Sequence, residues 1–329
     1  MNTAVSVDAA ELLSGSRRAL AKAITLVEST REDHRREAES LLDAALPHTG
    51  RSIRIGVTGV PGAGKSTFIE AFGLHLVHAG LRLAVLAVDP SSPLAGGSFL
   101  GDKTRMERLS REPDAFIRPS PAGGALGGVA HRTRESLLLC EAAGFEVILV
   151  ETVGVGQSEY EVAGMVDFFL VLMLPNAGDE LQGIKRGILE LADALVVNKS
   201  DGEGVAAAGR TRQHYQNALN LLTHGGFWIP RVLCCSALEG RGIAEVWDMI
   251  VEYRRAAEAN GALGERRARQ NAAWLRRLIA DLLEQRLRAD PRVAELLPRL
   301  EQQVLAGELT PRAAANLLVS DRPPAGGDG

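Results

Sequence analysis

Strand and helix patterns alternate through the middle of this chain. Near-continuous apolar runs predict strands, and the stretches between them place apolar residues at helical spacing. Runs that are apolar on both faces are typical of strands in a parallel sheet covered by helices on both sides. The predicted strands are 52–59, 81–89, 145–152, 166–175, 192–200 and 230–237, and the clearest helices are 65–79, 203–222 and 240–258. This alternation predicts a doubly wound, mostly parallel α/β domain over residues 51–258.

Helical patterns flank this domain on both sides. Residues 1–50 form a predicted N-terminal helical segment, whose apolar stripe ends before Pro47. Residues 259–320 form a predicted C-terminal helical arm, and residues 321–329 are expected to be a disordered tail. One face of the arm carries Trp274, Leu275, Leu278, Ile279, Leu282, Leu283 and Leu287. Since the helices of the α/β domain already cover its sheet, this stripe predicts a homodimer through the arm.

Charge and composition exclude several classes of protein. The net charge of −4 argues against a general nucleic-acid-binding surface, and no apolar run approaches the ~20 residues of a membrane span. The N-terminus lacks a basic region followed by a long apolar stretch, and Asp8 and Glu11 argue against a mitochondrial leader. Cys140, Cys234 and Cys235 do not have the spacing of metal ligands. We therefore expect a cytoplasmic protein that binds neither nucleic acid nor membranes.

Residues 59–66 read GVPGAGKS and match the phosphate-binding pattern GxxxxGK[ST] at every fixed position. The segment follows a predicted strand and opens a predicted helix, as this P-loop motif requires. Its glycines let backbone N–H groups surround an anion, and the helix points its positive end at the phosphates. Lys65 is expected to contact the outer phosphates and Ser66 to bind Mg²⁺. The predicted phosphate site consists of Gly59, Val60, Pro61, Gly62, Ala63, Gly64, Lys65, Ser66 and Thr67.

Residues 198–201 read NKSD and directly follow a predicted strand. The Asp201 carboxylate can accept two hydrogen bonds from the N1–H and amino groups of guanine, whereas adenine would leave it buried and unpaired. Lys199 is expected to lie along the base, and Asn198 to bridge to a neighbouring loop. A short loop after the last strand, whose backbone N–H reaches the guanine O6, completes the site with Ser236, Ala237 and Leu238. The two motifs together predict GTP and GDP as ligands.

Acidic residues at or near the ends of predicted strands are candidates for holding Mg²⁺. Asp89 and Glu151 end two strands, and Asp102 lies in a loop on the same side. Together with Ser66 they supply the oxygen ligands that Mg²⁺ prefers. Glu151 also begins the motif Glu-x-x-Gly, which makes Gly154 the candidate sensor of the γ-phosphate.

The residue after Gly154 is Val155, where Ras-like proteins have a Gln that positions the attacking water. We therefore expect slow intrinsic hydrolysis that a moving segment or a partner accelerates. Lys185 lies in a segment rich in glycine and acidic residues and is the candidate for delivering positive charge to the transferring phosphoryl group. Lys65, Glu151 and Lys185 are thus the predicted catalytic residues.

Four longer motifs carry a family resemblance. VDPSSP at 88–93, GGSFLGDKTRM at 96–106, ETVGVGQSE at 151–159 and the segment 174–193 resemble the methylmalonyl-CoA mutase-associated GTPases, the MeaB/ArgK family. The resemblance extends from about residue 12 to about residue 290. It implies a homodimeric GTPase that gates cofactor loading of an adenosylcobalamin-dependent acyl-CoA mutase and protects that enzyme. It also implies that the segment matching 174–187 senses the partner. The adenosyltransferase is a further candidate partner, and we do not expect the chain itself to hold cobalamin.

Three other functions remain as alternatives. A nickel or cobalt metallochaperone of the same class would carry a Cys or His cluster for its cargo, and the sequence shows none near the nucleotide motifs. A kinase acting on a protein would need a dedicated base near its acceptor. A scaffold without enzymatic activity is disfavoured because the P-loop lysine is intact.

Overall fold

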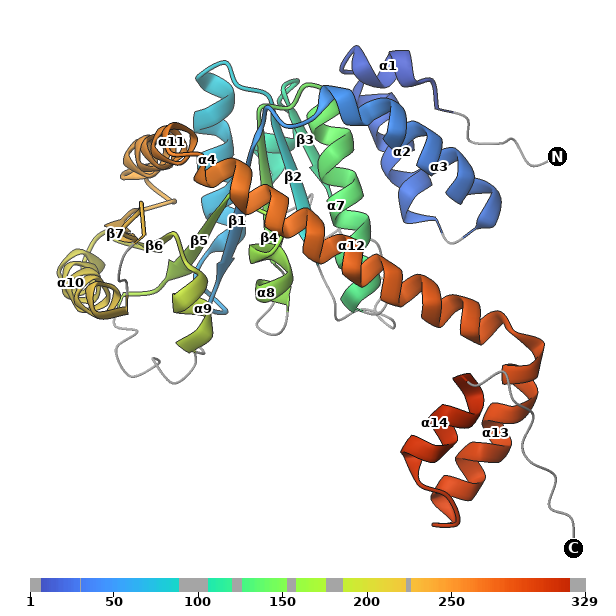
Figure 1. The fold of residues 1–329 in the computed structure, drawn as a ribbon. Helices are drawn as coiled ribbons and strands as arrows, with labels where there is room; N and C mark the ends of the chain where they lie inside the picture. Colours follow the sequence, from blue (N-terminus) through green and yellow to red (C-terminus); the bar gives the residue numbers. More distant parts are fainter. Residues whose placement is uncertain are drawn as a thin grey trace, which may run out of the picture. The chain divides into compact units, whose positions relative to one another are not determined.

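A parallel sheet forms the centre of the computed structural model, which describes residues 7–29, 31–88, 106–119, 126–152, 158–175, 186–222 and 226–319 (Figure 1). Within the described residues the sheet has seven strands in the order β3-β2-β4-β1-β5-β6-β7, and all six neighbouring pairs are parallel. The strands are β1 (Ile53–Gly59), β2 (Leu83–Val88), β3 (Ala115–Arg118), β4 (Val147–Thr152), β5 (Phe168–Met173), β6 (Ala194–Val197) and β7 (Arg231–Cys234). The predicted doubly wound α/β fold is confirmed.

The strand β3 was not among the predicted strands. It has only four residues and lies at the edge of the sheet, where it pairs with β2 alone. Two of its residues are only partly buried, so the sequence there is not the continuous apolar run of a central strand. The strand order reverses at β1, which lies between β4 and β5. Ligands of such sheets bind at this point, beyond the carboxyl ends of the strands.

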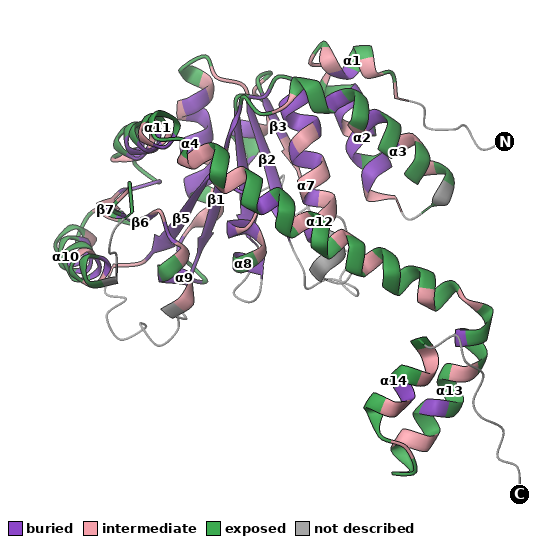
Figure 2. Ribbon diagram, in the orientation of Figure 1, coloured by how far each residue is buried: buried purple, intermediate pink, exposed green. Residues whose placement is uncertain are grey.

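Helices cover the sheet on both faces, and the strands between them are almost wholly buried (Figure 2). Helices α4 (Lys65–His78) and α11 (Ile243–Ala259) pack together, and α4 lies against β1 and β2. Helix α7 (Leu126–Ala142) packs on β2 and β4, while α10 (Gly204–Leu222) packs on β6 and β7. The shorter helices are α6 (Glu107–Ser110), α8 (Ser158–Ala163) and α9 (Arg186–Leu191).

The N-terminal segment forms helices that pack outside α7. They are α1 (Ala9–Leu13), α2 (Arg17–Glu28) and α3 (Glu32–Ala45), followed by the 3-10 turn η1 (Leu46–His48). Ser16 caps α2 because its hydroxyl accepts a hydrogen bond from the Ala19 N–H at 3.3 Å. Leu20 and Ile24 lie on the buried face of α2, so the predicted apolar stripe joins the core of the α/β domain.

Two successive arginines at the start of α12 (Ala262–Ala289) bind aspartates that immediately precede strands. The Arg267 guanidinium donates to both carboxylate oxygens of Asp167, before β5, at 2.7 and 2.6 Å. Arg266 donates to both oxygens of Asp193, before β6, at 3.1 and 3.0 Å. The Asp167 side chain has no exposed surface, and such a carboxylate is tolerated only when it is paired. The two ion pairs therefore fix the first turns of α12 to the sheet.

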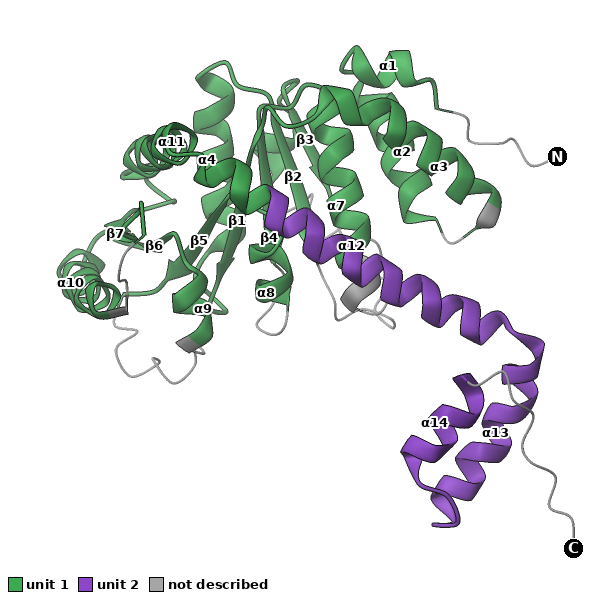
Figure 3. Cartoon of the chain, in the orientation of Figure 1, with its two compact units in different colours: residues 1–267 green, residues 268–329 purple. Residues whose placement is uncertain are grey.

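The chain divides into two compact units, residues 1–267 and 268–329, with the boundary inside α12 (Figure 3). In the second unit, α13 (Pro291–Leu305) and α14 (Pro311–Val319) pack on each other through Val293, Leu300 and Ala314. Asp290 caps α13 by accepting from the Arg292 N–H at 2.9 Å. The domain limits at 50/51 and 258/259 stay predictions. None of the described helices combines the length and the apolar character needed to cross a membrane.

Candidate functional site

The phosphate cradle lies between the end of β1 and the start of α4. A Cβ added to Gly59 would lie 2.4 Å from the carbonyl oxygen of Leu172, so only glycine fits beside β5. Gly64 precedes α4 in the left-handed conformation, with φ of 82°, and no side chain caps the helix. The first N–H groups of α4 therefore stay available to an anion, at the positive end of the helix.

The ammonium of Lys65 lies inside this cradle. Its Nζ donates to the carbonyl oxygen of Gly59 at 3.0 Å. Burial lowers the pKa of Lys65, while the charges of Glu151 and Glu159 act in the opposite direction. Because one of its three donors is held by the loop, the ammonium is directed towards the space that the loop encloses.

Ser66 and Glu151 meet across the site. The Ser66 hydroxyl is 3.5 Å from Oε1 of Glu151. Glu151 lies near the end of β4 and is only 5% exposed. A hydroxyl and a carboxylate at this separation fit Mg²⁺, which prefers hard oxygen ligands and completes its shell with phosphate and water. No group of three or more His, Cys, Asp or Glu side chains forms a metal site among the residues that the structure describes. The fit therefore rests on Ser66 and Glu151.

The base motif lies beside the cradle because Asn198 ties the two together. Its amide nitrogen donates to the carbonyl oxygen of Ala63 at 2.8 Å, and its amide oxygen accepts from the Ala237 N–H at 3.0 Å. Asn198 is only 2% exposed, so both ends of its amide are used inside the protein. One side chain thus connects the phosphate loop, the NKSD turn and the loop after β7.

The carboxylate of Asp201 faces the loop after β7. The Ser236 hydroxyl donates to Oδ2 of Asp201 at 2.5 Å. The preceding turn is tight, and Lys199 has a φ of 58°, the only positive value of a non-glycine residue in the described chain. Leu238 is 82% exposed at the tip of the loop after β7. This arrangement holds an acceptor carboxylate against a backbone loop, which suits a guanine base.

The structure thus brings together most of the residues predicted for the site. The phosphate loop from Gly59 to Thr67, the NKSD turn, the loop after β7 and Glu151 all lie at the carboxyl ends of β1, β4, β6 and β7. The other predicted site residues lie outside the described residues: Asp89, Asp102, Gly154 and Lys185.

Two features of the site were not predicted from the sequence. The Thr152 hydroxyl donates to the Thr58 hydroxyl at 2.7 Å, which links the carboxyl ends of β4 and β1 beside the phosphate loop. Glu159 has no exposed surface, and its charge acts on Lys65. In the sequence, the only sign of Glu159 was its place as an acidic residue shortly after Glu151, in the segment ETVGVGQSE.

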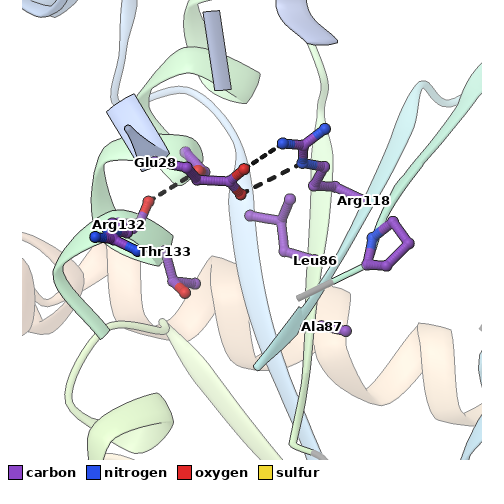
Figure 4. Close-up of a pocket in the computed structure, with 8 residues that line it drawn as sticks. Glu28, Leu86, Ala87, Arg118, Arg132 and Thr133 are labelled. Carbon is purple, nitrogen blue, oxygen red and sulfur yellow. Dashed lines mark hydrogen bonds and ion pairs between the residues drawn. The ribbon is translucent and has the colours of Figure 1, made fainter. Parts of the chain in front are cut away.

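A small cavity lies at the carboxyl ends of β2 and β3 (Figure 4). Arg118 pairs there with Glu28 of α2, and Arg132 and Thr133 of α7 line the other side. The cavity encloses about 10 Å³, roughly room for one water molecule. It is therefore too small for a cofactor and belongs to the packing of α2 and α7 on the sheet.

Known proteins resemble this chain over nearly its whole length. It is 54% identical over 267 residues to GTPase ArgK of Escherichia coli, covering 81% of each protein. It is 48% identical over 319 residues to the methylmalonic aciduria type A homolog, mitochondrial, of Mus musculus, covering 94% of this chain and 77% of that protein. A crystal structure described as an LAO/AO transport system kinase superposes with a TM-score of 0.75 at 43% identity, covering 94% of both chains.

The family model described as methylmalonyl-CoA mutase-associated GTPase MeaB matches residues 20–292. The matched region contains the phosphate cradle, Glu151, the NKSD turn and the loop after β7. The name of GTPase ArgK and the P-loop fold shared with the crystal structure both fit the nucleotide site described above, and the chain is a GTPase. By this match and by its site, the chain belongs to the family of methylmalonyl-CoA mutase-associated GTPases of the MeaB type.

Proposed function

We propose that this GTPase assembles an adenosylcobalamin-dependent acyl-CoA mutase with its cofactor, gates that loading, and protects the loaded mutase. Methylmalonyl-CoA mutase is the first candidate. The observation that carries the proposal is the match to the mutase-associated family over residues 20–292, which includes the whole described nucleotide site. A chaperone cycle of this kind needs a guanine nucleotide to report the state of assembly. The two hydrogen bonds of Asn198, which join the phosphate loop to the base motif, support the binding of such a nucleotide.

The residues of the site suit GTP hydrolysis with Mg²⁺. The first N–H groups of α4 and the ammonium of Lys65 would hold the β- and γ-phosphates, while Asp201 holds the base. Ser66 and Glu151 would hold Mg²⁺, which neutralises charge between the two outer phosphates when it is bound. Because Val155 replaces the water-positioning Gln of Ras-like proteins, intrinsic hydrolysis is slow and the partner supplies what is missing. Lys185 is our candidate for the activating cation.

The second element of the proposal is a homodimer through α12. Four apolar residues of the predicted stripe are about half exposed or more: Leu275, Ile279, Leu282 and Leu283. An apolar stripe of this length on a long helix is typical of an interface. The adenosyltransferase that makes the cofactor is a further proposed partner, since loading must be coupled to its supply.

A pull-down of the mutase followed by GTP hydrolysis tests the proposal. The full-length chain is expected to bind the mutase, and the bound form to hydrolyse GTP faster than the free form. Lys185→Ala is expected to keep basal hydrolysis and lose most of the stimulation, where a cation supplied to the phosphoryl group can be worth ~10³-fold. Lys22→Ala, an exposed lysine of α2, is the control and should respond as the parent does.

Absence of binding in any nucleotide state would contradict the mutase assignment. Binding with full stimulation of Lys185→Ala would contradict only the role of that lysine. Transfer of the γ-phosphate to the mutase or another protein, followed with labelled GTP, would instead revive the kinase alternative.

A further inference from the structure

The short helix α8 follows the Glu-x-x-Gly motif in the chain and is held on two sides. Val162 packs on β1 at Gly56, where an added Cβ would lie 2.9 Å from its Cγ1. Arg134 of α7 donates from Nη2 to the carbonyl oxygen of Gly164, just after the helix, at 2.6 Å. These contacts fix the buried side and the C-terminal end of α8 and leave Tyr160 on its outer side.

The hydroxyl of Tyr160 lies against the backbone of Gly187 in α9, the helix next to α8 (Figure 1). A Cβ added to Gly187 would lie 2.1 Å from this hydroxyl oxygen and 3.3 Å from Cζ. Gly187 does not have a positive φ, so its backbone conformation does not require glycine. Glycine within a helix costs roughly 0.5–1 kcal/mol relative to alanine. The approach of Tyr160 is therefore the physical reason for glycine at this position.

Tyr160 is 46% exposed, so burial in the core does not explain why its ring lies here. The residue before it, Glu159, is fully buried and acts on the Lys65 ammonium through its charge. Of two consecutive residues of α8, one is thus a buried acid whose charge acts on Lys65 and the other contacts α9. In the sequence, Gly187 follows the candidate Lys185 by two residues.

We propose that Tyr160 is a positioning residue for GTP hydrolysis: its hydroxyl, seated on the backbone of Gly187, sets the spacing of α8 and α9 and so the placement of the buried carboxylate of Glu159. The two helices then move as one body, and a displacement of α9 changes the cradle. The proposal concerns hydrolysis by the chain alone and does not depend on the identity of the mutase.

The test adds a methyl group at the contact and then removes the atom it meets. Gly187→Ala in the full-length chain is expected to lower kcat about tenfold or more, because small misplacements near reacting groups are costly in rate. KM for GTP and the affinity for GDP should stay at the parental values, since Asn198 and Asp201 lie on other elements. The double variant Gly187→Ala/Tyr160→Phe should recover most of the rate, because the nearest remaining atom is 3.3 Å from the new methyl group.

Gly209→Ala is the matched control. Gly209 lies within α10, and an added Cβ meets nothing within 4 Å, so hydrolysis should be unchanged. A parental kcat in Gly187→Ala, or no recovery in the double variant, overturns the proposal. If Gly187→Ala melts at a much lower temperature than the parent, its kcat does not test the contact by itself. Tyr160→Ala then serves as the test, because it removes the contact without adding atoms. A lowered kcat with parental GDP affinity in that variant supports the proposal, and a parental kcat overturns it.

Discussion

The Ser236 hydroxyl donates a hydrogen bond of 2.5 Å to Oδ2 of Asp201, and so joins the loops that follow β6 and β7. The same hydroxyl accepts from the Glu239 N–H at 3.1 Å, which fixes its direction. A carboxylate oxygen can accept more than one hydrogen bond, so both oxygens of Asp201 stay available to a base. Ser236 therefore orients the acid that we expect to select guanine.

Asp201→Asn is predicted to change the preferred base. The amide keeps the size of the side chain but replaces one acceptor with a donor, which opposes the N1–H and amino donors of guanine. GTP binding should weaken by about 1–3 kcal/mol, the cost of an unsatisfied buried polar group. Xanthosine triphosphate, which offers a carbonyl in place of the amino group, should bind the variant better than GTP. Calorimetric titration with both nucleotides measures the change.

Ser236→Ala separates orientation from recognition. The acid remains, so GTP affinity should fall less than in Asp201→Asn and no preference for xanthosine triphosphate should arise. Unchanged GTP affinity in Asp201→Asn would show that the base lies elsewhere.

The central strands could be predicted from the sequence because they are buried on both faces. Apolar runs predicted β1, β2, β4, β5, β6 and β7, with bounds that differ from the observed ones by a few residues. The edge strand β3 gave no such run, because its last two residues are partly buried and polar Arg118 ends it. The other edge strand, β7, was predicted because it lies within the longer apolar run VLCCSA.

Parts of the site that belong to a contiguous motif could also be predicted, and long-range contacts outside such motifs could not. GVPGAGKS and NKSD are read directly from the chain. Because NKSD is a known motif, the bridge from Asn198 to a neighbouring loop was predicted, although its bond to Ala63 spans 135 positions. The pairing of Arg267 with Asp167, 100 positions apart, belongs to no motif and was not predicted. Nothing in the local pattern around Arg267 distinguishes it from the other arginines of an exposed helix.

The pair of Arg267 and Asp167 is predicted to be essential for stability. Arg267→Gln would leave a fully buried carboxylate without its counter-charge, and breaking a buried pair in this way typically costs about 3–5 kcal/mol. Urea unfolding of the full-length variant should show a midpoint well below that of the parent.

The control for this prediction is Arg288→Gln. Arg288 pairs with Glu284 on the same helix at 2.7 Å, but both side chains are more than half exposed. Such surface pairs contribute about 0–1 kcal/mol, so the midpoint should barely move. Equal effects of the two substitutions would mean that the buried pair does not hold α12 to the sheet.

The proposed dimer is tested by charging the apolar stripe of α12. Leu275→Glu/Leu282→Glu places two carboxylates on the stripe, which a packed interface would have to bury at a cost of several kcal/mol. The parent should be a dimer and the variant a monomer by light scattering at micromolar concentration, with GTP binding retained. Leu305→Glu, at an 87% exposed position outside the stripe, should leave the dimer intact. A monomeric parent contradicts the interface.

Glu135 of α7 is predicted to make stability depend on pH near neutrality. Burial raises its pKa to about 7 from an ordinary value of 4.5, with Glu39 of α3 adding to the rise and Arg132 opposing it. The folded protein therefore holds this proton more tightly than the unfolded chain does. Stability is unaffected below the unfolded pKa, falls as pH rises from about 4.5 to 7, and stays lowered above the folded pKa.

Glu135→Gln removes the charge and keeps the shape of the side chain. The variant should be more stable than the parent by about 3 kcal/mol at pH 8, because the pKa rises from 4.5 to about 7 on folding and each pKa unit corresponds to about 1.4 kcal/mol. The gain should shrink through pH 6 and vanish well below pH 4.5, where the parent carboxyl is protonated in both states. Urea unfolding at several pH values measures this difference, with Glu245→Gln on the exposed face of α11 as the control. A difference between parent and variant that is the same at pH 5 and pH 8 would show that Glu135 stays ionised in the folded protein, and that the contact of α3 with α7 accommodates its charge.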